Sequence, residues 1–284
     1  MKKIVFILIT TAIFIASANI GKAQVQTPTK QRTSAYSKVH TVNTRPIPYE
    51  NLREADVIWA KKVWRIIDLR EKINLPLYYP KTKKDDRFSL IDLLLHGIQH
   101  EGIAAYDVDD DEFTVPITMD NIKVKFGAIN DTITEPNADG KMETTIVPGQ
   151  MITSEVKQIM IKEQWIFDKQ ASRMIVRIIG ICPIREFTKK GSDEILRSQV
   201  FWVRYSDVRK LLANHEVFNP FNDAARLSFD QIFNIRRFNG LIYQITNVHD
   251  NRRIQDYTMG IESLYEAERL ENQISNWEQD LWEY

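Results

Sequence analysis

The chain has 284 residues, of which 38 are Lys or Arg and 38 are Asp or Glu, so its formal net charge is zero. This balance argues against an electrostatic nucleic-acid-binding protein, which carries a strongly basic face. The single cysteine, Cys182, excludes an internal disulfide, so the core must be stable without a covalent cross-link. Because Cys182 lies in the apolar stretch 178–184, we expect a buried small hydrophobic residue and not a reactive thiol.

The first 23 residues have the organisation of a bacterial signal peptide. A short basic start is followed by an apolar run over residues 4–15 and then by small residues, the pattern that a signal peptidase cleaves. We expect cleavage after Ala23, which makes Gln24 the mature N-terminus. An uncleaved anchor is disfavoured because the run is shorter than the ~20 residues of a spanning helix. A lipoprotein has cysteine where this chain has Gln24, so we expect neither a lipid on the chain nor direct membrane insertion.

Cleavage would leave about 260 residues, enough to bury one large core or two small ones. The signal segment holds Lys2, Lys3 and Lys22 and no acidic residue, so the mature net charge is 35 minus 38, or −3. Residues 24–48 are polar and nearly free of large apolar side chains, which predicts an extended or disordered arm. Residues 49–284 are predicted to form a single α+β domain of mixed helices and antiparallel strands.

The first element of this domain is predicted to be a helix over residues 52–72. Its apolar side chains recur at a spacing that places these on one face: Leu52, Ala55, Trp59, Val63, Ile66 and Ile67. Val57 and Trp64 lie off that stripe, so the helix is apolar on more than one side. It is either sandwiched within its own domain or presents one side to a neighbouring subunit. Tryptophan is enriched at such contacts, so Trp59 and Trp64 are candidate partner-binding residues.

A loop with a proline on each side follows, and its Tyr78 and Tyr79 are further candidates for partner binding. Ser89 is a suitable N-cap for a helix from Leu90 to about Glu101. The next expected elements are strands at 103–108 and 113–117, a helical turn over 119–125 capped by Thr118, and an exposed loop or hairpin end at 130–142.

The middle of the chain is its most strand-like part. Residues 164–167 and 174–184, separated by a turn at 168–172, predict a hairpin. Residues 152–163 fit helical and strand spacing equally well, and both readings stay open. The later expected elements are a strand at 199–205, a short helix from Ser206 through Leu212, a helix over 229–238 capped by Ser228, and a strand at 241–246.

The chain ends in a predicted amphipathic helix over about 256–282. Its apolar side chains recur every three or four residues, and its other faces are strongly acidic. A terminal helix of this length usually docks on its own domain. The alternative is a partner-binding helix anchored by Trp277 and Trp282, and the sequence supports both equally.

Two clusters of polar residues have some features of metal sites. His96 and His100 are four residues apart on a predicted helix, a spacing that places two imidazoles on one metal, but no third ligand is identifiable and the Glu of the zinc-protease motif is missing. We therefore expect a structural role. The acidic run 107–112 lacks the Gly and Glu that a calcium loop needs, at positions that Glu112 and Thr118 occupy. A solvated turn is expected, with a surface for a basic partner left open.

We find no nucleophile elbow, phosphate-binding loop, dinucleotide fingerprint or paired Cys-x-x-Cys motif, so we predict no catalytic residue, no metal and no cofactor. Carboxylate pairs assembled in space leave no local signature, so a periplasmic cell-wall hydrolase or peptidoglycan-binding module remains the alternative. The helix with His96 and His100 is its best candidate site.

Several segments between residues 45 and 256 resemble one known family. They are 45–49 (RPIPY), 53–57 (READV), 59–65 (WAKKVWR), 74–76 (NLP), 106–114 ending in DEFT, 162–170 (KEQWIFDKQ), 177–181 (RIIGI) and 218–220 (FNP). Together they resemble the GldN/PorN family of gliding-motility and type IX secretion proteins.

The resemblance implies a non-enzymatic periplasmic subunit. Such a protein associates with an outer-membrane lipoprotein of the GldK/PorK type in a large ring and contacts the periplasmic part of a GldM/PorM-type motor protein. The family offers no catalytic residues to transfer. A lipidated partner would also supply the tether that a chain beginning at Gln24 lacks.

Overall fold

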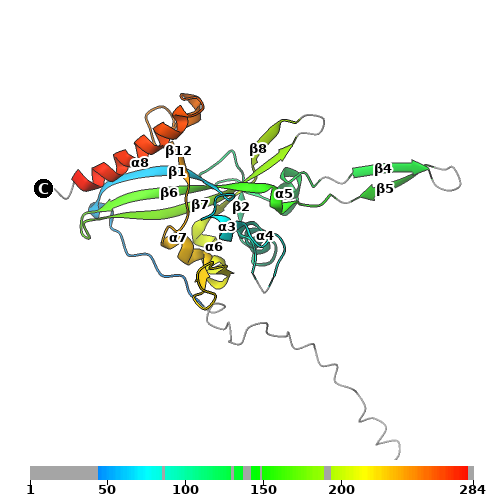
Figure 1. Ribbon diagram of the computed structural model, residues 1–284, viewed down its shortest axis with the longest axis horizontal. Helices are drawn as coiled ribbons and strands as arrows, with labels where there is room; N and C mark the ends of the chain where they lie inside the picture. Colours follow the sequence, from blue (N-terminus) through cyan, green and yellow to red (C-terminus); the bar gives the residue numbers. More distant parts are fainter. Residues whose placement is uncertain are drawn as a thin grey trace, which may run out of the picture. The chain divides into compact units, whose positions relative to one another are not determined.

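The computed structural model describes residues 44–84, 87–128, 149–188 and 193–280, and the backbone of 131–136 and 142–147. The predicted signal peptide with its expected cleavage after Ala23, the predicted arm up to residue 43, and Trp282 lie outside the described residues. The α+β class is confirmed, since helices and antiparallel strands both occur (Figure 1). No helix in the described part is both long and apolar enough to cross a membrane.

The main sheet is antiparallel and, within the described residues, has eight strands in the order β12-β1-β6-β7-β9-β2-β3, with β8 also paired to β7. Its strands are β1 (Val57–Asp68), β2 (Ala105–Tyr106), β3 (Pro116–Ile117), β6 (Val156–Asp168), β7 (Arg173–Thr188), β8 (Ile195–Gln199), β9 (Trp202–Arg204) and β12 (Leu241–Ile245). Two small ribbons pair β10 (Glu216–Val217) with β11 (Leu227–Ser228) and β4 (Asp131–Pro136) with β5 (Met142–Val147).

The α-helices are α3 (Leu75–Tyr78), α4 (Leu90–His100), α5 (Met119–Lys125), α6 (Tyr205–Asn214), α7 (Phe229–Asn234) and α8 (Glu262–Asp280), and short 3-10 turns are η1 (Glu54–Asp56), η2 (Thr153–Glu155) and η3 (Ile254–Asp256). The predicted N-caps are confirmed. The hydroxyls of Ser89, Thr118 and Ser228 accept backbone N–H groups of α4, α5 and α7.

The helix predicted over 52–72 is wrong, because most of this segment forms the strand β1, next to the edge strand β12. β1 lies between β12 and β6 and is covered on both faces, so its consecutive residues Val63, Trp64 and Arg65 are all buried. A strand buried on both faces loses the alternation that marks a half-exposed strand. Its abundance of β-branched and aromatic residues was the signal that favoured a strand.

The hairpin predicted across the 168–172 turn is confirmed as β6 and β7, which pair from Asp168 with Arg173 back to Val156 with Arg185. The open segment 152–163 is therefore mainly strand, preceded by the turn η2.

Other boundaries differ from prediction. The strands expected at 103–108, 113–117 and 199–205 shrink to β2, β3 and β9, α7 ends at Asn234, and α8 begins at Glu262 instead of residue 256. The stretch expected as a loop or hairpin end at 130–142 contains β4 and the start of β5.

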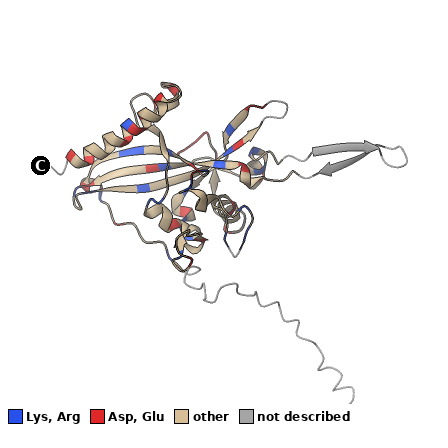
Figure 2. Ribbon diagram, viewed as in Figure 1, with Lys and Arg blue, Asp and Glu red and all other residues tan. Residues whose placement is uncertain are grey.

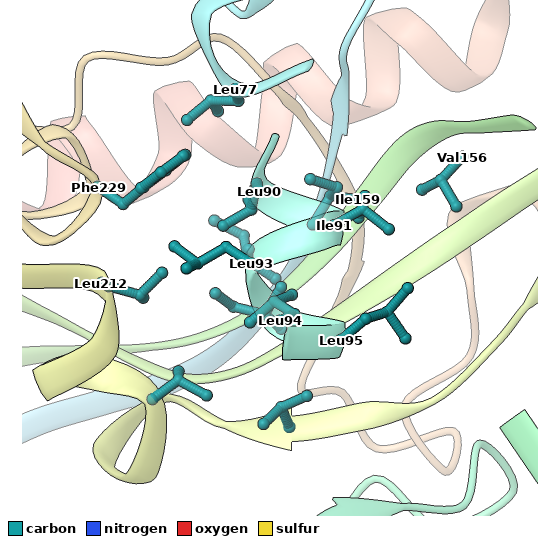
Figure 3. Packing of buried hydrophobic residues seen from close by; sticks show 14 of the residues in the cluster. Leu77, Leu90, Ile91, Leu93, Leu94, Leu95, Val156, Ile159, Leu212 and Phe229 are labelled. Atoms are coloured by element: carbon teal, nitrogen blue, oxygen red, sulfur yellow. The ribbon is translucent and has the colours of Figure 1, made fainter. Parts of the chain in front are cut away.

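Helix α4 is the centre of the largest hydrophobic cluster. Its side chains Leu90, Leu93 and Leu94 are fully buried and meet Ile159 of β6 and Leu212 of α6 (Figure 3). The other sheet face carries a second cluster, in which the loop after β2 folds back so that Phe113, Trp202, Trp64, Met160 and Cys182 pack together. The two faces are thus covered by different parts of the chain.

The end of the predicted arm is held on the domain without regular secondary structure. The Arg209 guanidinium donates to the carbonyl of Ile47 at 2.6 Å and lies 4.0 Å from the ring centroid of Tyr49. Arg177 donates to the carbonyl of Glu50 at 2.6 Å. Arg209 is itself fixed by the buried Asp230 at 3.0 Å. Residues 44–50 therefore lie along α6 and β7 as a strap.

Candidate interaction surfaces

One cavity of 1030 Å³ opens between the segment around α3 and the loop after β10. We call it the aromatic groove. Its lining is Lys72, Ile73, Leu75, Pro76, Tyr79, Pro80, Lys84, Arg87, Phe218, Pro220, Phe221 and Arg237. Phe221 is 82% exposed, and Phe218, Tyr79 and Ile73 are each nearly half exposed. Large apolar side chains gathered at an exposed surface mark an interaction site.

The neighbouring residues Tyr78 and Tyr79 have different roles. The Tyr78 hydroxyl donates to the carbonyl of Ser154 at 2.8 Å, and its ring packs against the main core. Tyr79, one residue past the end of α3, is 47% exposed and lines the groove. The structure thus brings Tyr79, but not Tyr78, into a surface that a partner could contact.

Buried hydrogen bonds hold α3 in place. The side-chain amide of Asn74, which is fully buried, donates to the carbonyls of Asp68 and Asn239 at 2.8 and 2.9 Å. Pro76 lies in the first turn of α3, where its missing N–H costs no helical hydrogen bond. The segment that carries Tyr79 is therefore anchored to the end of β1.

The opposite wall is a short loop that presents Phe221. The side chain of Asn219 donates to the carbonyl of Ala225 at 2.8 Å and accepts the backbone N–H of Phe221 at 3.2 Å. These bonds close the turn, and Phe221 extends from it toward solvent. The FNP segment at 218–220, which resembles the GldN/PorN family, thus contributes Phe218 and Pro220 to the groove, a role that no local pattern in the sequence predicts.

Basic residues surround this apolar lining. The Arg237 guanidinium lies 5.0 Å from the ring centroid of Phe221, and that of Arg87 lies 5.5 Å from the ring of Phe218. Arg87 is also paired with Glu216 at 2.8 Å. Together with two lysines of the lining, these side chains favour a ligand that is apolar and acidic.

A second exposed apolar surface lies at the start of α8. Met259, Ile261, Leu264 and Tyr265 are 86, 65, 48 and 64% exposed. We call these four residues the outer face of α8. The inner face, with Ala267, Leu270 and Ile274, is buried against β12 and β1. The apolar stripe predicted from 256 to 282 is therefore only partly buried, since Ile261 and Leu264 face solvent.

The predicted partner-binding tryptophans make contacts inside the domain. Trp59 of β1 and Trp277 of α8 stack with ring centroids 4.6 Å apart, and Phe167 meets Trp277 edge-on at 5.6 Å. Both indoles are half-buried and line a shallow hollow beside α8. This stacking fixes the C-terminal half of α8 to the sheet, as the docked-helix alternative predicts.

Trp64 is only 4% exposed and anchors the acidic run to the sheet. Its indole N–H donates to the Oδ2 of Asp111 at 2.9 Å. The buried Lys162 ammonium lies 3.2 Å from the same carboxylate and donates to the carbonyl of Asp111 at 2.8 Å. The run that sequence reasoning treated as a solvated turn therefore has one member, Asp111, fixed by buried partners.

Comparison with protein families identifies the family of this chain. A model of the family described as "Gliding motility associated protein GldN" matches residues 52–283. The chain belongs to the GldN family. A search of curated proteins found no match.

The GldN match confirms the resemblance drawn from the sequence from residue 52 onward, and it extends the resemblance past residue 256 through α8. Both the aromatic groove and the outer face of α8 lie inside the matched region. The GldN family is defined by gliding motility and not by a catalytic activity.

The histidines considered as metal ligands pack beside Phe88. The imidazole centroids of His96 and His100 are 4.7 Å apart, and Phe88 lies 5.4 Å from both His96 and His215. Burial, and next the neighbouring His100, lower the pKa of His96. Across the described residues, no three His, Cys, Asp or Glu side chains converge where a metal ion would bind.

Burial raises the pKa of the Cys182 thiol to about 12.

Proposed function

We propose that this protein is a non-enzymatic scaffold subunit of a type IX secretion and gliding-motility machine in the periplasm. It self-associates in a large ring, binds an outer-membrane lipoprotein of the GldK/PorK type, and contacts the periplasmic part of a GldM/PorM-type motor protein. Family membership supports the gliding assignment. The signal-peptide pattern over residues 1–23 supports export, and the absence of cysteine at Gln24 supports tethering through a lipidated partner.

The aromatic groove is the observation that carries the scaffold assignment. A monomer gains nothing from an 82% exposed Phe221 beside a half-exposed Tyr79, since each leaves apolar area in water at about 25 cal/mol per Å². Covering these side chains with another protein recovers that free energy. A subunit with such a surface is suited to assembly.

The test is the mass and composition of the native particle. The chain would be tagged at its C-terminus, released gently from its own envelope, and weighed while co-purifying chains are identified. The proposal expects a particle many times the 33.2 kDa chain mass, with an outer-membrane lipoprotein in it. A lone monomer without that lipoprotein contradicts the scaffold assignment.

A matched pair of variants links the particle to the groove. Phe221→Ser removes the most exposed aromatic of the groove, whereas Val248→Ser removes a side chain that is 92% exposed and lies in neither surface. We expect the first variant to reduce assembly and gliding, and the second to leave both unchanged. If the two variants assemble and glide equally well, the groove is not needed for assembly or gliding.

A further inference from the structure

We propose that the aromatic groove receives the outer face of α8 from a second copy of this chain. The contact is head-to-tail, with one surface on each copy. This inference rests on the proposed function in assuming a self-associating scaffold, and it adds which surfaces meet.

The outer face has the side-chain spacing of a helix that docks in a groove. Ile261, Leu264, Tyr265 and Glu268 stand at positions i, i+3, i+4 and i+7, which project from one side of a helix. All four are exposed. Backbone bonds from Leu264 and Tyr265 to the carbonyl of Ile261 extend this helical geometry one residue ahead of α8. Three apolar anchors followed by an acidic residue are thus presented together.

The helix is already fixed in the shape that docking requires. Leu270 and Ile274 on its inner face are buried against β12 and β1, and the stacked pair of Trp59 and Trp277 holds its far end. The Tyr257 hydroxyl donates to Glu266 at 3.1 Å near its start. A preorganised helix loses little conformational entropy on binding, so its exposed side chains contribute more of their burial energy to affinity.

The charges of the two surfaces are opposite. Acidic residues, drawn red in Figure 2, recur along helix α8. The helix contains six acidic residues and one basic residue, Arg269, which pairs with Glu266 at 2.6 Å. Glu262 and Glu268 of this helix are exposed. Among the described residues, the lining of the groove contains Lys72, Lys84 and Arg237, together with Arg87 in its pair with Glu216, and no acidic residue. Complementary charges of this kind fix the orientation of a docked helix and exclude like-charged partners.

The two surfaces share no residue, and both are exposed in the same copy. Each copy therefore offers one groove and one helix face, and no part of the chain that the structure describes covers either of them. Repetition of a contact between different surfaces builds a closed ring or an open filament, whereas a two-fold contact stops at a dimer. The arrangement thus provides a physical route to a many-membered assembly from a single type of contact.

Two single variants of the mature chain, residues 24–284, test the contact. Phe221→Ser disables the groove, and Tyr265→Ser disables the helix face. Both side chains are exposed, so circular dichroism and thermal melting should match the parent chain. Each variant alone should lose self-association by roughly tenfold or more, as for a central aromatic anchor, when measured by sedimentation and mass photometry. Val248→Ser should retain the parent distribution.

Mixing the two variants gives the decisive result. The intact helix face of the groove variant fits the intact groove of the helix variant, so a mixture should form one-to-one dimers and nothing larger. A mixture that stays monomeric, or single variants that assemble like the parent chain, overturns the proposed contact.

Different outcomes would contradict the scaffold assignment and the head-to-tail contact. If Phe221→Ser loses the lipoprotein but still self-associates, the groove belongs to that partner: the head-to-tail contact is overturned and the scaffold stands. If the parent chain neither self-associates nor retains a lipoprotein, the proposed function itself is wrong, and the contact with it.

Discussion

Gly180 of β7 tests the packing on the sheet face opposite α4, where the loop after β2 covers the sheet. A Cβ added at Gly180 would lie 2.5 and 2.8 Å from ring carbons of Phe113 and 3.2 Å from the carbonyl of Val203. Real Cβ atoms do not approach other atoms at 2.5 Å, so Gly180→Ala must displace the Phe113 ring. That ring is itself constrained, because Phe113 has a positive φ of 61° and packs edge-on against Trp202 and Tyr106.

The expected cost follows from two opposing effects. Overpacking a filled core destabilises by about 1–3 kcal/mol. Replacing glycine by alanine also restricts the unfolded chain, which stabilises by about 0.4–1 kcal/mol. Since Gly180 is in an extended strand and no positive φ adds strain, we expect Gly180→Ala to lower the free energy of unfolding by about 1–2 kcal/mol. Urea denaturation of the mature chain, followed by tryptophan fluorescence, measures this difference.

A double-mutant cycle identifies the cause. Phe113→Leu removes the ring carbons that the new Cβ would meet, so Gly180→Ala should cost much less in that background than in the parent chain. A coupling of at least 1 kcal/mol, about what one displaced ring costs, is expected. If Gly180→Ala costs the same with Phe113 and with leucine, the ring is not the neighbour that excludes a side chain, and the packing argument is refuted.

Further predictions concern buried charges, titration and the strap. Glu163→Gln should destabilise by about 3–5 kcal/mol in chemical denaturation, because Glu163 is fully buried and the change removes a counter-charge of the buried Arg65, 3.7 Å away, and of Arg236, 2.8 Å away. The lowered pKa of His96 means that the unfolded chain binds more protons near pH 6.5, so the melting temperature should fall as pH drops below that value and His96→Gln should flatten the slope. Tyr49→Ala should leave the melting temperature nearly unchanged but speed proteolysis at residues 44–50, since the ring under Arg209 is lost. The thiol of Cys182 should react with a disulfide reagent only on unfolding, because burial raises its pKa to about 12.

The elements that could be predicted from the sequence are those with local signals. Ser89 and Ser228 mark helix starts with side-chain caps, and the turn at 168–172 separates two β-rich runs. The helix prediction over 52–72 was wrong because the apolar pattern of this segment is set by the strands and segments that pack against it. A strand between two others and covered on both faces buries consecutive residues, and the apolar positions of such a run can match a helical repeat by chance.

The candidate site was predictable only in part. Tyr79 was identified from its proline-fenced loop, and it does line the groove. Phe221 gave no local signal, since it reaches the groove through a turn held by Asn219, more than 140 residues after Tyr79 in the chain. Trp64 was selected for its residue type, but its indole is occupied by Asp111 inside the domain. Residue type indicates what a side chain can bind, and only the fold shows what it already binds.

The charged pair at the centre of β6 shows why polar residues in a strand can specify a fold. Lys162 and Glu163 are successive residues, so they point to opposite faces of the sheet, and both are buried. Lys162 holds the loop after β2 through Asp111, and Glu163 holds the segment after α7 through Arg236. A one-residue slip in strand register would exchange these faces and leave both charges without partners in the core, at a cost of several kcal/mol each. The two charges that interrupt the apolar pattern of this strand therefore select one register and one set of covering segments.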